Sequence, residues 1–116
     1  EVFNITNTDY FRWENLWPGF ARAFGMEPGG VQTIRLAEFM ADKGPLWADM
    51  QRRHGLRPIP YEELVSWPFV DYCLTRDYDV MSDTLKIRKA GFTDGLDSEA
   101  MFLRLFAEFR AMRVIP

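Results

Sequence analysis

Glu1-Val2-Phe3-Asn4-Ile5-Thr6 is the stretch of this 116-residue chain on which the prediction of its fold depends. Apolar and polar side chains alternate along it, which is typical of a half-buried β-strand. A strand this short is not stable alone in water and needs a neighbouring strand, yet no obvious neighbour follows it in the chain. We therefore expect this chain to be the C-terminal piece of a larger protein, and its function to depend on the missing part.

The rest of the chain is dominated by helical patterns. Asp9 and Asp97 are suited to cap two helices, and Pro18 lies inside the first of them, where it would bend or restart the helix. Residues 31–36 and 78–81 alternate and predict two further short strands. The apolar stripes of the two helices are Trp13, Leu16, Trp17, Phe20 and Phe24, and Phe102, Leu105, Phe106, Phe109 and Met112. The predicted fold class is α+β, mainly α, with two or three short strands, in a single domain over residues 1–116.

Composition narrows the classes of function. Hydrophobic residues make up 47% of the chain and aromatic residues 16%, so we expect some rings to face a partner or a ligand. The net charge of −3 argues against nucleic-acid binding, which needs a basic surface. No apolar run approaches the roughly 20 residues of a membrane span. One cysteine, Cys73, fits a reducing compartment, and we expect a cytoplasmic protein.

Sites for catalysis, phosphate or metal are not evident. The glycines do not form a Gly-x-Gly-x-x-Gly turn between a strand and a helix. The acidic run at residues 77–83 resembles the start of a calcium loop, but Ser82 and Arg88 stand where that loop requires Gly and Glu. A Cys73–His54 dyad is an open alternative without local support. We predict no catalytic, cofactor-binding or metal-binding residue in this chain.

Short motifs spread over essentially the whole chain resemble a known family when they are taken together. They are Phe3-Asn4-Ile5, Asn7-x-Asp9, Phe11-x-Trp13, Leu16-Trp17, Asp42-Lys43-Gly44-Pro45-Leu46-Trp47, Gly55-Leu56, Trp67 with Phe69, Asp83 with Lys86, Gly91-Phe92 and Val114-Ile115-Pro116. This combination resembles the C-terminal part of extended short-chain dehydrogenase/reductases, in the branch of the progesterone reductases and iridoid synthases.

The resemblance implies a missing N-terminal Rossmann domain that binds NADP or NAD and carries the catalytic Tyr and Lys. This chain would be the helical lobe that closes over a small-molecule substrate, with no cofactor bound by itself. Trp67, Phe69 and Cys73 are the implied substrate-binding residues, since Phe69, Tyr72 and Cys73 share one face of the helix that follows Ser66. The implied parent is an NAD(P)-dependent enone or carbonyl reductase, or an epimerase or dehydratase, and the fragment alone would be inactive.

Two positions depart from the family pattern. Thr8 stands where the family usually has glycine, which suggests a turn with positive φ that a β-branched residue resists. We therefore expect the turn geometry to differ here. Pro68 replaces what is often an aromatic residue, which would reshape the substrate pocket.

A second hypothesis is a stand-alone helical module for protein interaction or dimerisation, without catalysis. Under either hypothesis residues 2–6 and an aromatic face would be exposed, and such surfaces pair with other chains. We therefore expect a homo-oligomer, joined through residues 2–6 and the aromatic face.

Overall fold

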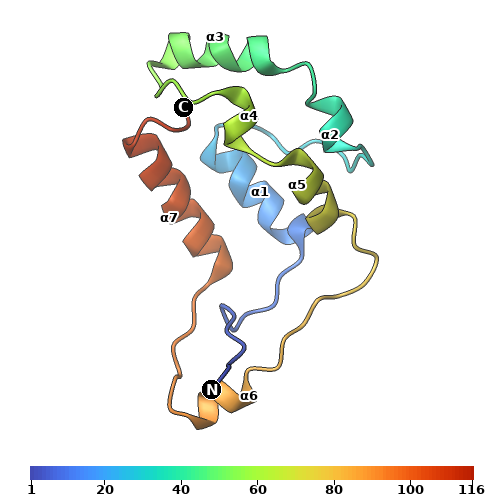
Figure 1. Ribbon diagram of the computed structural model, residues 1–116, viewed down its shortest axis with the longest axis vertical. Coiled ribbons are helices and arrows are strands. Elements are labelled where there is room, and N and C mark those ends of the chain that lie inside the picture. The colour runs from blue at the N-terminus through green and yellow to red at the C-terminus, as the bar shows by residue number, and fades with distance from the viewer. The chain divides into compact units, whose positions relative to one another are not determined.

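The computed structural model describes all residues 1–116 and contains seven helices (Figure 1). In chain order they are α1 (Trp13–Ala23), α2 (Leu36–Phe39), α3 (Gly44–His54), α4 (Tyr61–Leu64), α5 (Trp67–Leu74), α6 (Leu85–Lys89) and α7 (Ser98–Ala111). The longest, α7, has 14 residues, and none of the helices could cross a bilayer. The chain divides into two compact units, a first unit of Glu1–Gly29 with Val80–Ala107 and a second unit of Gly30–Asp79 with Glu108–Pro116.

The mainly helical class is confirmed, but the short strands are not seen. Residues 1–6 and 78–81 lie outside any helix and form no ladder, and the alternating segment at 31–36 runs into α2 at Leu36. A strand is held by backbone hydrogen bonds to a neighbouring strand, and no segment of this chain supplies one. Alternation of side chains alone does not stabilise a strand, and the two or three strands predicted for residues 1–116 are not seen in this structure.

Side chains from the α6 region hold the first residues of the chain instead. The Lys86 Nζ donates a hydrogen bond to the carbonyl oxygen of Val2, at 2.9 Å, and also lies over the Phe3 ring. The Asn4 side-chain amide donates to the backbone carbonyl of Asp83, at 3.2 Å. The backbone of residues 1–4 is therefore tethered without being paired in a ladder.

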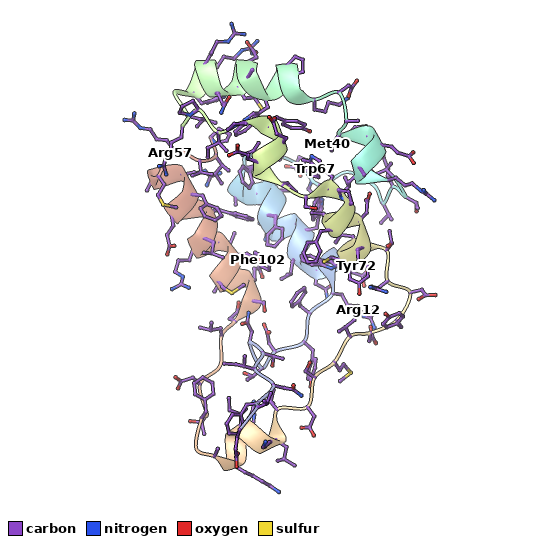
Figure 2. The ribbon with its side chains drawn as sticks, viewed as in Figure 1. Arg12, Met40, Arg57, Trp67, Tyr72 and Phe102 are labelled. Atoms are coloured by element: carbon purple, nitrogen blue, oxygen red, sulfur yellow. The ribbon has the colours of Figure 1, made fainter.

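Aromatic rings join α1 to the N-terminal part of α7 within the first unit. Phe20 makes edge-to-face contacts with Phe102 and Phe106, at ring-centroid distances of 5.1 and 5.2 Å. Phe102 projects from α7 toward α1 (Figure 2). Edge-to-face pairs add about 0.5–1.5 kcal/mol each to the area that they bury. Leu16 on the same side of α1 is only 5% exposed, so the two predicted apolar stripes do face each other here.

Of the two predicted effects of Pro18, a restart of the helix is wrong, because α1 runs as one helix from Trp13 to Ala23. A proline this far into a helix removes one backbone hydrogen bond and crowds the preceding turn. The ring contacts of α1 with α7 offset that cost, because they bind residues on both sides of the proline to the same neighbouring helix.

Asp9 caps a different helix from the one predicted. The residue that precedes α1 is Arg12, whereas the two carboxylate oxygens of Asp9 accept hydrogen bonds from the backbone N–H and the hydroxyl of Ser98, at 2.7 and 2.9 Å. Ser98 is the first residue of α7 and is 1% exposed. The predicted cap at Asp97 is confirmed, since its Oδ1 accepts from the backbone N–H of Ala100. Two carboxylates therefore serve the start of α7, where negative charge is stabilised.

Thr8 adopts a positive φ of 72°. The turn thus has the conformation that a glycine would favour, and our expectation of a different geometry there was wrong. The turn places the residues on either side of Thr8 next to the start of α7. The carbonyl of Asn7 accepts a hydrogen bond from the backbone N–H of Leu96, and Asp9 accepts one from that of Ser98. A non-glycine residue in this region costs about 1–2 kcal/mol, and these hydrogen bonds offset the cost.

In the second unit α3 packs against α4 and α2 against α5. The connector between α3 and α4 contains Pro58 and Pro60 and is tied to α3 by side chains. The carbonyl of Ile59 accepts hydrogen bonds from the Trp47 indole N–H and the Gln51 amide, at 3.0 and 2.9 Å. The helix α3 ends before Gly55, which has a φ of 60°. The connector therefore fixes where α4 begins.

Replacing Thr8 by glycine should stabilise the chain. The substitution removes the strain of positive φ, while glycine adds entropy to the unfolded chain, so the net gain is about 0.5–1 kcal/mol. Thr8→Ala keeps a Cβ and should bring no gain. Urea unfolding of the three proteins checks this, and a Thr8→Gly chain less stable than Thr8→Ala would contradict it.

The Asp9 contact also predicts how stability depends on pH. The backbone N–H of Ser98 lowers the pKa of Asp9 from its ordinary value of 3.8. Because the pKa is lower in the folded chain than in the unfolded one, this stabilisation is present above the unfolded value and is lost as the pH falls through the folded value. We expect the free energy of unfolding of Asp9→Asn to vary less below pH 3.8 than that of the wild type.

Urea unfolding over a pH series makes the comparison. Asp94→Asn removes an exposed carboxylate from the same unit and serves as the control. Its free energy of unfolding should follow the same pH dependence as that of the wild type. Parallel curves for the wild type and Asp9→Asn would refute the assignment.

Candidate functional site

The helix α5 has two faces of different character. Its half-buried residues are Trp67, Val70 and Asp71, whereas Phe69, Tyr72 and Cys73 are exposed. This division follows the helical period, because positions three and four apart share a face. We call Phe69, Tyr72 and Cys73 the outer face of α5; the structure confirms that these three residues share it.

Asp71 fixes the inner side of α5. Its two carboxylate oxygens accept hydrogen bonds from the backbone N–H groups of Leu36 and Ala37, at 2.7 and 2.9 Å. These are the first two residues of α2, so the carboxylate satisfies donors that a helix start leaves without partners. The bonds allow only one rotation of α5 about its axis, and that rotation leaves the outer face open.

A pocket of about 620 Å³ lies where α2 ends and α5 begins. Met40, Ala41 and residues 61–68 line it, and Figure 2 shows Met40 and Trp67 there. The Tyr61 hydroxyl donates to the carbonyl of Met40, at 2.7 Å, and its ring lies 6.5 Å from that of Trp67. The volume falls within the range of about 300–1,000 Å³ that small-molecule pockets occupy. The pocket has an aromatic wall and the carboxylates of α4 among its lining residues.

One of the three predicted substrate-binding residues lines this pocket. Trp67 lines the pocket, while Phe69 and Cys73 lie on the outer face and do not line it. Sequence reasoning missed Tyr61 and Met40. They are 21 residues apart, and their hydrogen bond joins a hydroxyl to a backbone carbonyl, a type of contact that leaves no sequence signal. A role for the three predicted residues in substrate binding stays a prediction.

The outer face carries two adjacent exposed rings. Phe69 and Tyr72 are 63% and 61% exposed, and their rings stack at 6.4 Å with an interplanar angle of 20°. Exposed aromatic rings that lie together are typical of a surface that a ligand or a partner covers. The nearly parallel rings present flat, apolar surfaces, which suit a flat, apolar or conjugated molecule.

The structure gives little geometric support for a metal site or for a Cys–His catalytic dyad. No group of three or more His, Cys, Asp or Glu side chains is placed to hold a metal ion. Cys73 is exposed on α5, His54 ends α3, and no hydrogen bond joins them. The Cys73–His54 dyad therefore has no contact to support it.

Asp71→Ala should destabilise the second unit. Loss of the cap leaves the N–H groups of Leu36 and Ala37 without acceptors, which costs about 1–2 kcal/mol. Asp71→Asn retains one acceptor oxygen and should cost less. Asp77→Ala removes an exposed carboxylate beyond α5 and is the control. Urea unfolding tests the order, and equal stabilities of Asp71→Ala and Asp77→Ala would show that the cap contributes nothing.

The chain has clear relatives, although no protein-family model matches it. It is 32% identical over 120 residues to an (S)-8-oxocitronellyl enol synthase of Camptotheca acuminata and 34% identical over 121 residues to one of Nepeta cataria. It is 30% identical over 131 residues to a short chain dehydrogenase of Penicillium aethiopicum. Each comparison covers 100% of this chain but only 31%, 30% and 35% of the relative, so the chain spans about a third of the length of these curated relatives.

These similarities cover the whole chain and confirm the resemblance that its short motifs indicated. The chain is therefore similar, over its whole length, to about a third of two oxocitronellyl enol synthases and of a short chain dehydrogenase.

Proposed function

We propose that this chain forms the substrate-binding part of an NAD(P)-dependent reductase and acts together with a nucleotide-binding domain. The observation that carries the proposal is the exposed aromatic outer face of α5, in a chain whose relatives are named as enol synthases and a dehydrogenase. Those relatives are about three times as long as the part that matches. A longer protein of this kind would have a second domain against which such a face could close.

The residues of this chain do not themselves fit a dinucleotide. A dinucleotide site places a glycine-rich turn between a strand and a helix. Here Gly29 and Gly30 lie in a segment outside any helix, and the structure contains no strand. We propose that the nucleotide-binding domain holds NADP or NAD and carries the catalytic residues.

The contribution of this chain would be to bind, orient and cover the substrate. Phe69 and Cys73 on the outer face, and Trp67 at the start of the same helix, are the proposed contacts. Rings that cover an apolar substrate exclude water from the reacting atoms and limit the orientations that the substrate can take. A substrate with a conjugated double bond would match the flat surfaces of Phe69 and Tyr72.

The second candidate is an interaction module that assembles with copies of itself. It is favoured by the exposure of Val2 and Ile5, at 84% and 66%, in a segment without a ladder partner. Residues 2–6 and the outer face would then be covered by another copy. Under this hypothesis the chain binds no substrate.

The test uses the full-length gene product with NADPH and a panel of conjugated enals, enones and simple aldehydes, and it follows NADPH oxidation. Phe69→Ala should raise KM about ten-fold with a smaller change in kcat, because it removes contact area to the bound substrate. Phe39→Ala, which removes an exposed ring from α2, should leave both constants unchanged.

A full-length protein that neither binds NADPH nor reduces any compound of the panel would overturn the reductase proposal. If that protein also forms dimers that dissociate when Ile5 is replaced by aspartate, the interaction module is supported in its place. A Phe69→Ala enzyme with unchanged KM would exclude the outer face as the substrate surface.

A further inference from the structure

An arginine lies beside the outer face of α5 and is held there by aromatic rings. Arg76 stands two residues beyond Leu74, the last residue of α5, and its contact with Tyr72 places it next to that face. Its guanidinium carbon lies 3.6 Å from the centroid of the Tyr72 ring and 5.5 Å from that of the Tyr78 ring. Its Nη1 donates a hydrogen bond to the Tyr78 hydroxyl, at 2.9 Å.

Arg76 has N–H groups that no protein acceptor uses. A guanidinium carries five N–H groups, and its contacts in this structure are one neutral hydroxyl and two ring faces. By contrast, Arg52 and Arg53 pair with Asp49 on the same helix. Arg35, just before α2, pairs with Glu38 on that helix. Arg76 is thus half-buried, positively charged and ordered by rings, without a carboxylate to neutralise it.

The arrangement lowers the cost of binding an anion. Stacking on Tyr72 and the bond to Tyr78 fix the plane of the guanidinium before any ligand arrives, so less side-chain entropy is lost on binding. The two coplanar oxygens of a carboxylate match the paired donors of a guanidinium edge. Only Nη1 donates to a protein acceptor, so the other N–H groups of the guanidinium can reach a ligand.

We propose that the outer face binds a flat, unsaturated carboxylate, with its conjugated part on the rings of Phe69 and Tyr72 and its carboxylate on Arg76. This inference rests on the proposed function, since it names the substrate class of the same face. The rings alone would accept any apolar molecule, whereas an ordered arginine at one end of them selects for negative charge there. Arg76 is then the residue that determines specificity.

The test is equilibrium binding by calorimetry to the full-length gene product, without added cofactor. The probes are cinnamate and its neutral analogue cinnamamide, which share the ring and the double bond. Cinnamate should bind the wild type about ten-fold more tightly than cinnamamide, because charge-assisted, bidentate hydrogen bonds are the stronger kind. Arg76→Gln should abolish this preference and leave the affinity for cinnamamide unchanged.

Two further variants keep the result interpretable. Arg53→Gln removes the same charge from α3, where Arg53 pairs with Asp49, and should retain the preference. Arg76→Lys keeps the charge but not the planar fork, so the preference should be intermediate. Far-ultraviolet circular dichroism confirms that each variant is folded.

Equal affinities of the wild type for the two probes, or an unchanged preference in Arg76→Gln, would overturn the inference. This binding test is independent of the reductase proposal, because it measures affinity without cofactor and without turnover. A carboxylate preference in a protein without NADPH oxidation supports this inference. NADPH-dependent turnover of neutral enals without any preference contradicts it.

Discussion

The carboxylate of Asp71 accepts hydrogen bonds from the backbone N–H groups of Leu36 and Ala37, and the arrangement of the candidate site depends on this pair of bonds. A helix of four residues such as α2 is not stable alone and needs tertiary contacts. Asp71 supplies its cap and, at the same time, sets how α5 is rotated about its axis. Since Val70 and Trp67 lie on the half-buried side, the outer face has to point away from α2.

A similar contact organises the first unit. Two charge-assisted hydrogen bonds join Asp9 to Ser98. They offset the roughly 1–2 kcal/mol that a positive φ costs at Thr8. The strained turn is therefore tolerated, because it allows Asp9 to reach the start of α7. Ring contacts between α1 and α7 then build an aromatic cluster beside this capped end.

The proposals about function follow from what these contacts leave uncovered. Few side chains of the chain are fully buried, and most of its large apolar residues are exposed. In the relatives, the matching region is about a third of a longer protein, and a second domain would explain much of this exposure. On the outer face, the rings of Phe69 and Tyr72 would contribute affinity, whereas Arg76 would contribute selectivity, because only the arginine distinguishes charged from neutral ligands.

Sequence reasoning succeeded where the deciding interactions are local. The start of α7 depends on Asp97, which is three residues before its partner Ala100. The composition of the outer face of α5 follows from helical spacing alone. The resemblance to the short-chain dehydrogenase/reductases was likewise recognisable from motifs in the sequence, and three relatives confirm that resemblance.

Tertiary structure decided what local patterns cannot encode. The alternating residues 1–6 form no strand, because a strand depends on a neighbour that this chain does not provide. Asp9 caps α7, 89 residues away in sequence, and Tyr61 closes the pocket through a bond to Met40. The sequence by itself determined which helices form and which side chains share a face, since these depend on residues a few positions apart. Only the folded chain determined which partner each polar group found, because that choice is made between segments far apart in sequence.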